Sequence, residues 1–142
     1  MLFQRFNNQE ERRMFGGSDF LELQFCQHKS GTSIKRIVNK IENWHNASLY
    51  ISGDDMDTFY KCYKDVFKNG TYNNLKSGEI DFFGINYYSP EQVEEMIKII
   101  EETKPTDYKT VLDWLVKAKE FNGVYILGVW LKCRSWFYEF WF

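Results

Sequence analysis

Residues 79–128 constrain the fold most, because they read without interruption as a strand, a capped helix, a second helix and a buried strand. Residues 80–88 are rich in aromatic and β-branched side chains, which predicts a strand with both faces at least partly covered. Residues 124–131 contain no charged side chain, which is typical of a central strand buried on both sides. The two intervening helices are therefore expected to pack on a sheet that contains these strands.

The first helix of this stretch has a clear start. Ser89 is the expected N-cap, Pro90 fits the first helical position, and Gln92 completes a capping box. Four apolar residues at three- and four-residue spacing predict its buried stripe: Val93, Met96, Ile97 and Ile100. Five glutamates fall outside that stripe and predict an acidic face: Glu91, Glu94, Glu95, Glu101 and Glu102.

Pro105 separates this helix from the second one, because the residue before a proline is forced out of the α region. Thr106 is the expected cap of the second helix. That helix is amphipathic and should end at Asn122 and Gly123, which tolerate a left-handed backbone.

The N-terminal segment is less regular. Residues 1–17 predict either a short strand or a loosely docked arm. Residues 19–27 alternate apolar and polar side chains, with Glu22 and Gln24 on the polar side. This alternation predicts a half-buried strand that lies at an edge or has one open face.

The segment between these two parts predicts two more helices and one strand. Ser33 is expected to start a helix, and residues 48–52 predict a short strand. Three acidic residues follow that strand and are expected to cap a third helix: Asp54, Asp55 and Asp57. Residues 71–78 then predict a loop.

The order strand, helix, strand, helix, strand, helix, helix, strand predicts an α/β or α+β fold, with about four to six strands in one sheet and about four helices. At 142 residues the chain is expected to form a single globular domain over residues 1–142. Residues 130–142 are predicted to be an aromatic terminal strand or arm. A strand would place four aromatic side chains on one side, either against the sheet or in a contact surface: Trp136, Tyr138, Phe140 and Phe142.

Residue types that carry catalysis or bind metals are few and scattered. His28 and His45 lie at no metal-ligand spacing, and the three cysteines form neither a zinc nor a disulfide pattern. The acids at 54–57 lack the ligand pattern of a calcium loop. The sequence therefore predicts no catalytic residue, no metal and no cofactor. An enzyme would require His28, Cys26 or the acidic cluster at Asp54 to converge in a cleft.

Charge is distributed unevenly along the chain. A net charge of −2 argues against a direct nucleic-acid partner. Residues 79–107 hold eight acidic residues against two lysines, whereas residues 1–40 hold four acidic against seven basic residues. The acidic excess predicts either a solvated face or a surface that steers a basic partner. With no signal peptide, no apolar run that could cross a bilayer and few cysteines, a cytoplasmic protein with no membrane partner is expected.

Residues 81–92 and 122–128, together with Lys104-Pro105, Tyr108 and Trp114-Leu115, resemble small immunity proteins of bacterial polymorphic-toxin and contact-dependent growth inhibition systems. The resemblance implies a cytoplasmic antitoxin that binds the toxin domain of its own system, often a nuclease, and occludes its active site. It supplies no catalytic residue and no cofactor.

Charge and resemblance together predict the surface that would meet such a toxin. The expected toxin-binding residues are acidic: Asp54, Asp55, Asp57, Glu91, Glu94, Glu95, Glu101 and Glu102. The aromatic contact candidates are Trp136, Tyr138, Phe140 and Phe142. Two other readings stay open, namely a structural or regulatory homodimer built on residues 130–142 and an unrecognised small enzyme.

Overall fold

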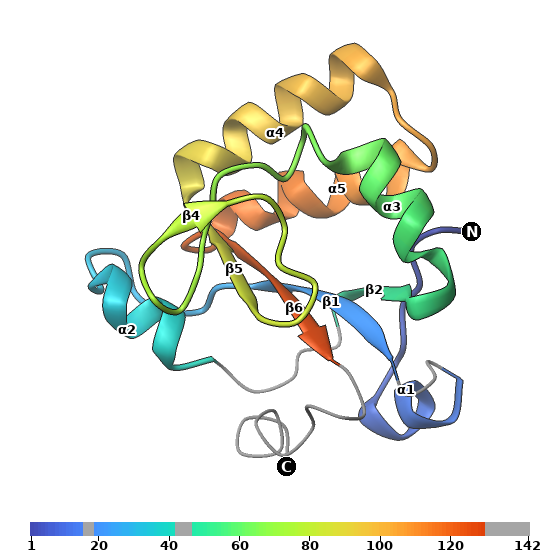
Figure 1. Ribbon diagram of the computed structural model, residues 1–142, viewed down its shortest axis with the longest axis horizontal. Helices are drawn as coiled ribbons and strands as arrows, with labels where there is room; N and C mark the ends of the chain where they lie inside the picture. Colours follow the sequence, from blue (N-terminus) through green and yellow to red (C-terminus); the bar gives the residue numbers. More distant parts are fainter. Residues whose placement is uncertain (16–18, 42–46, 130–142) are drawn as a thin grey trace.

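The computed structural model describes residues 1–15, 19–41 and 47–129 (Figure 1). Six strands in these residues form one antiparallel sheet in the order β2-β1-β6-β5-β3-β4. The strands are β1 (Phe20–Phe25), β2 (Leu49–Ser52), β3 (Gly70–Thr71), β4 (Ser77–Gly78), β5 (Ile85–Tyr88) and β6 (Val124–Val129). The predicted class, one sheet of four to six strands packed with helices, is confirmed.

Five α-helices and two short 3-10 helices accompany the sheet in the described residues. The α-helices are α1 (Gln9–Phe15), α2 (Ile34–Asn39), α3 (Met56–Tyr63), α4 (Pro90–Thr103) and α5 (Tyr108–Lys117). The 3-10 helices are η1 (Gly53–Asp55) and η2 (Ala118–Glu120). Among the described residues, no helix combines the length and the apolarity needed to span a bilayer.

The helices lie in two layers, with α3, α4 and α5 on one side of the sheet and α1 and α2 on the other (Figure 1). Residues such as Leu23, Ile126 and Trp114 form the larger core between the sheet and α3, α4 and α5. A smaller core joins Val38 of α2 to Tyr125 on the opposite face of the sheet. Side chains on both faces of the central strands are therefore buried.

The expectation that residues 19–27 form a strand at an edge or with one open face is wrong. β1 lies between β2 and β6, and all six of its residues are buried. Glu22 and Gln24 are 0% and 1% exposed. The alternation of apolar and polar side chains along β1 thus reflects two buried faces of different polarity. It does not reflect one buried face and one solvated face.

The first residues of the chain are packed on the fold, which differs from a loosely docked arm. Leu2, Phe3 and Phe6 are buried, and Phe3 contacts the rings of Phe59 and Tyr63 edge-on. Gln4 pairs with Tyr50 of β2 through two backbone hydrogen bonds of 2.8 Å. Gln4 therefore adds a single β-bridge on the outer side of β2. The segment leads into α1, a helix that the sequence analysis did not predict.

Two expectations for the middle of the chain need correction. The strand predicted over residues 80–88 is confined to β5, because Asp81 accepts a hydrogen bond from the Phe83 backbone N–H and turns the chain. Asn86 fastens that turn by donating to the carbonyl oxygens of Asp81 and Ile126. Residues 71–78, predicted as a loop, form the β3–β4 hairpin together with Gly70.

The predicted N-terminal cap is confirmed for α4 and is wrong for α5. Both hydrogen bonds of the Ser89–Gln92 capping box are present, and α4 ends where Lys104 adopts a left-handed backbone. Thr106 does not cap α5. Asp107 occupies the cap position with a positive φ of 56°, and its carboxylate accepts the Leu2 backbone N–H at 2.7 Å. A contact with the start of the chain has therefore taken the place of a side-chain cap.

Candidate functional site

The outward surface of α4 is the clearest charged feature that the sequence predicted. We name it the acidic face: Glu91, Glu94, Glu95, Glu101 and Glu102, all of which are exposed. The opposite side of α4 is buried through Val93, Met96, Ile97 and Ile100. Within the described part of the chain, none of these glutamates has a carboxylate oxygen within 4 Å of a cationic nitrogen. Lys98 is also exposed on this side of α4, four residues from both Glu94 and Glu102, so five carboxylates and one ammonium group leave a net negative charge that is available to a partner.

The acidic face is held on a fixed support. The capping box fixes the start of α4, and the Gln92 side-chain amide also donates to the Asn69 carbonyl oxygen at 2.9 Å. A cavity of about 80 Å³ lies between α4 and the turn at Asn69. This volume is well below the roughly 300 Å³ at which small-molecule sites begin, so the surface suits a protein partner better than a small ligand.

The second acidic group does not join the acidic face. Asp54 and Asp57 are exposed and Asp55 is half-buried, at the junction between β2 and α3. The turn that touches α4 lies at the other end of α3, so the two groups form separate surfaces (Figure 1). The carboxylates also do not cap the helix as expected, because the Ser52 hydroxyl accepts the Asp54 N–H instead.

The aromatic contact candidates Trp136, Tyr138, Phe140 and Phe142 lie outside the described residues, as do His45 and Cys133. The homodimer reading, which depends on residues 130–142, therefore stays a prediction.

Two of the residues named in the enzyme reading, Cys26 and His28, line one cavity of about 330 Å³, whereas Asp54 does not line it. Asp54 lies beside the start of β1, where the Gly53 N–H donates to the Asp19 carbonyl oxygen at 2.9 Å. Cys26 directly follows the other end of this six-residue strand, a separation of about 20 Å at the usual rise per residue. The thiol of Cys26 is buried against the Tyr125 hydroxyl, whereas the His28 Nε2 lies 2.6 Å from the Lys40 carbonyl oxygen. The described residues also hold no cluster of three or more potential metal ligands.

A buried polar group on β1 was not predicted. We name it the Glu22 cluster: Arg12, Glu22, Gln24, Ser48 and Tyr50, all of which are buried. Burial raises the pKa of Glu22 to about 8, although Ser48, Gln24, Arg12 and Tyr50 each favour the ionised form. Burial also lowers the pKa of Arg12, whose guanidinium lies 5.0 Å from the centre of the Phe20 ring. The polar positions of β1 were visible in the sequence, but the layer that covers them was not.

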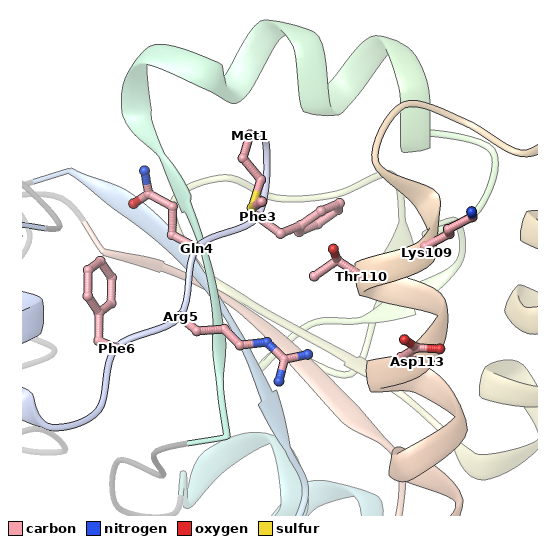
Figure 2. A pocket seen from close by; sticks show the side chains of 8 residues that line it. All are labelled: Met1, Phe3, Gln4, Arg5, Phe6, Lys109, Thr110 and Asp113. Atoms are coloured by element: carbon pink, nitrogen blue, oxygen red, sulfur yellow. The ribbon is translucent and has the colours of Figure 1, made fainter.

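A groove at the edge of the sheet was also missed. We name it the edge groove: Met1, Phe3, Gln4, Arg5 and Phe6 on one side, and Lys109, Thr110 and Asp113 of α5 on the other. Its volume is about 610 Å³, within the range of ligand and peptide sites. Figure 2 shows Phe3 and Arg5 extending toward α5, whereas Gln4 and Phe6 extend to the other side. No local pattern in the sequence marks this groove, because its two walls lie about a hundred residues apart.

A search of protein-family models finds no match to the chain, and neither the curated proteins nor the solved structures yield one.

Proposed function

We propose that this protein is an immunity protein, an antitoxin of the bacterial cytoplasm that binds a cognate toxin domain and neutralises it without covalent chemistry. The observation that carries the proposal is the acidic face, with five exposed glutamates that form no ion pair with another described residue. The resemblance of residues 81–92 and 122–128 to such proteins points the same way.

Nucleases bind a polyanion, so their active-site surfaces are commonly basic. An acidic surface on a fixed helix attracts a basic protein, raises the rate of encounter and disfavours partners of the wrong charge. Occlusion requires only that the bound protein covers the path of the substrate, which explains why no cofactor or catalytic residue is needed. Each single charge at the rim of the interface is expected to contribute little to affinity. The summed charge of the acidic face is expected to raise the association rate.

The test first asks whether the gene lies directly downstream of a gene for a large secreted protein. The C-terminal domain of such a neighbour is then co-expressed with this protein, and the result is scored by growth and by co-purification. Rescue of growth together with a stable complex is the expected result. Normal toxicity and no complex, with this protein shown to be folded, would contradict the proposal.

A charge-reversed variant then tests the acidic face. In this variant, lysine replaces four glutamates at once: Glu94, Glu95, Glu101 and Glu102. The change should slow association with the toxin and weaken protection, most strongly at low salt. The matched control reverses Glu10 and Asp65, two exposed acidic residues outside the predicted toxin-binding set, and should leave protection unchanged. Unchanged protection by the first variant would remove the acidic face from the interface.

A further inference from the structure

Residues 2–6 lie along the outer side of β2 and are joined to it by a single β-bridge at Gln4. Gln4 both donates to and accepts from Tyr50 of β2, at 2.8 Å in each direction. Backbone groups along a strand point alternately to its two sides, so those of Arg5 point away from β2. Arg5 is exposed, and its N–H and carbonyl group form no hydrogen bond with any other residue in the part of the chain that the structure describes. This edge therefore has backbone donors and acceptors available to another strand.

The edge is rigid enough to act as a template. Asp107 holds the Leu2 N–H at 2.7 Å, and the buried rings of Phe3 and Phe6 anchor the segment on both faces of the sheet. Phe6 packs 5.0 Å from the ring of Tyr50. A partner strand would therefore meet an ordered edge, and little conformational entropy of this chain would be lost on binding.

The edge groove gives this segment a second wall and a charge. Arg5 and Lys109 are opposed by Asp113 alone, so the lining side chains are net positive in a chain whose net charge is −2. Arg5 extends toward α5, where Thr110 adds a hydroxyl group (Figure 2). No carboxylate lies within 4 Å of the guanidinium of Arg5 among the described residues. A bidentate acceptor such as a carboxylate matches the fork of an arginine.

We propose that the edge groove binds an extended segment of a partner protein, which pairs with the backbone of Arg5 as an added strand and places an acidic side chain beside the Arg5 guanidinium. Backbone pairing supplies affinity in this mode of recognition, and the side chain supplies specificity. The cavity of about 610 Å³ provides room for the segment between the edge and α5. This proposal does not depend on the proposed antitoxin function, because it concerns another surface and a partner of opposite charge.

The first experiment selects binders from a phage-displayed library of random linear eight-residue peptides on the intact protein. The expected result is enrichment of sequences in which Asp or Glu is flanked by β-branched or aromatic residues. A synthetic copy of an enriched peptide should bind in solution and slow hydrogen exchange at the Arg5 amide. Failure to enrich such sequences would overturn the proposal.

Two substitutions at one position separate the backbone from the side chain. Arg5→Val removes the charge and keeps the N–H, whereas Arg5→Pro removes both. Proline is tolerated on edge strands, and the Arg5 N–H donates no hydrogen bond to another described residue. Arg5→Val should weaken peptide binding, and Arg5→Pro should weaken it roughly tenfold more. Equal affinities for the two variants, both folded by circular dichroism, would refute strand addition.

Lys109→Glu tests the charge of the groove without touching the edge, and an acid in the first turn of a helix does not disfavour α5. It should weaken binding of the acidic peptide, whereas Glu94→Gln on the acidic face should not. A homodimer in solution that Arg5→Pro converts to a monomer would assign the groove to a second copy of the chain and overturn the proposal.

Discussion

Replacing Glu22 with glutamine should remove a large pH dependence from the stability of the fold. Glu22 is fully buried on β1, and burial raises its pKa from the ordinary value of 4.5 to about 8. Glutamine has nearly the same shape but cannot ionise, so the substitution separates the effect of ionisation at residue 22 from the effect of packing. Gln24 Nε2, which lies 3.4 Å from a carboxylate oxygen of Glu22, keeps an oxygen to donate to.

The sign follows from the direction of the shift. Between pH 4.5 and 8 the carboxyl group of Glu22 is protonated in the folded chain and ionised in the unfolded chain, so folding binds a proton. The stabilising contribution is complete below pH 4.5 and is lost as pH rises through 8. Each pH unit in this range costs about 1.4 kcal/mol, and the loss from pH 5 to pH 8 amounts to roughly 3 to 4 kcal/mol.

The assay is urea unfolding of the wild type and of Glu22→Gln at pH 5 and pH 8, followed by tryptophan fluorescence and circular dichroism. The quantity compared is the difference in unfolding free energy between the two proteins at each pH. This difference should move in favour of the variant by roughly 3 to 4 kcal/mol at the higher pH. Glu94→Gln on the exposed side of α4 is the matched control and should show no such change.

A difference that stays constant within about 0.5 kcal/mol between pH 5 and pH 8 would refute the reasoning. It would mean that the carboxylate of Glu22 is stabilised in the fold as well as it is in water. Arg12 is the group that could achieve this, because it lies in the same cluster and is the only cation that lowers the pKa of Glu22 among the described residues. Arg12→Met should then be strongly destabilising at pH 8, as expected when one member of a buried ion pair is removed.

Three further substitutions test local structure through urea unfolding and hydrogen exchange. Ser89→Ala should lower the unfolding free energy by about 1 kcal/mol, because it removes the cap of α4; an unchanged midpoint would contradict this. Gly123→Ala should cost roughly 2 kcal/mol or more, since φ is +92° and the added Cβ would lie 2.2 Å from the Tyr88 carbonyl oxygen; a stable variant would show that this turn can relax. Asp107→Ala should speed hydrogen exchange at the Leu2 and Gln4 amides, because the acceptor for Leu2 is lost; equal exchange rates would show that the buried rings alone hold the edge.

The sequence predicted the parts of the fold that depend on local patterns. The stripe and capping box of α4 lie within fourteen residues, so periodicity and cap chemistry specified both its start and its buried side. The apolar run of β6 specified a strand buried on both faces, and β6 lies between β1 and β5. The acidic face followed directly, because the residues left out of a buried helical stripe face solvent.

Features that depend on distant pairing could not be predicted. Glu22 is buried because Arg12, Ser48 and Tyr50 surround it, and alternation within β1 cannot reveal what covers the second face. Local cap chemistry predicts Thr106 as the cap of α5, but Asp107 occupies that position and its carboxylate accepts the N–H of Leu2, 105 residues away. Local rules assign each polar group to a near neighbour, and tertiary contacts overrode that assignment at these positions.

The two proposed surfaces have opposite charge and lie on neighbouring helices of one layer, which makes them experimentally separable. The acidic face of α4 attracts a basic surface, whereas the edge groove beside α5 is net positive and attracts an acidic segment. Salt weakens both, so salt alone cannot distinguish them. Charge reversal can distinguish them. Lysines on α4 should weaken toxin binding and leave binding of the acidic peptide unchanged, whereas Lys109→Glu should weaken binding of the acidic peptide and leave toxin binding unchanged. A single partner that responds to both changes must therefore present a basic surface and an acidic strand together. Such a response would show that the two surfaces form one interface around the α4–α5 pair.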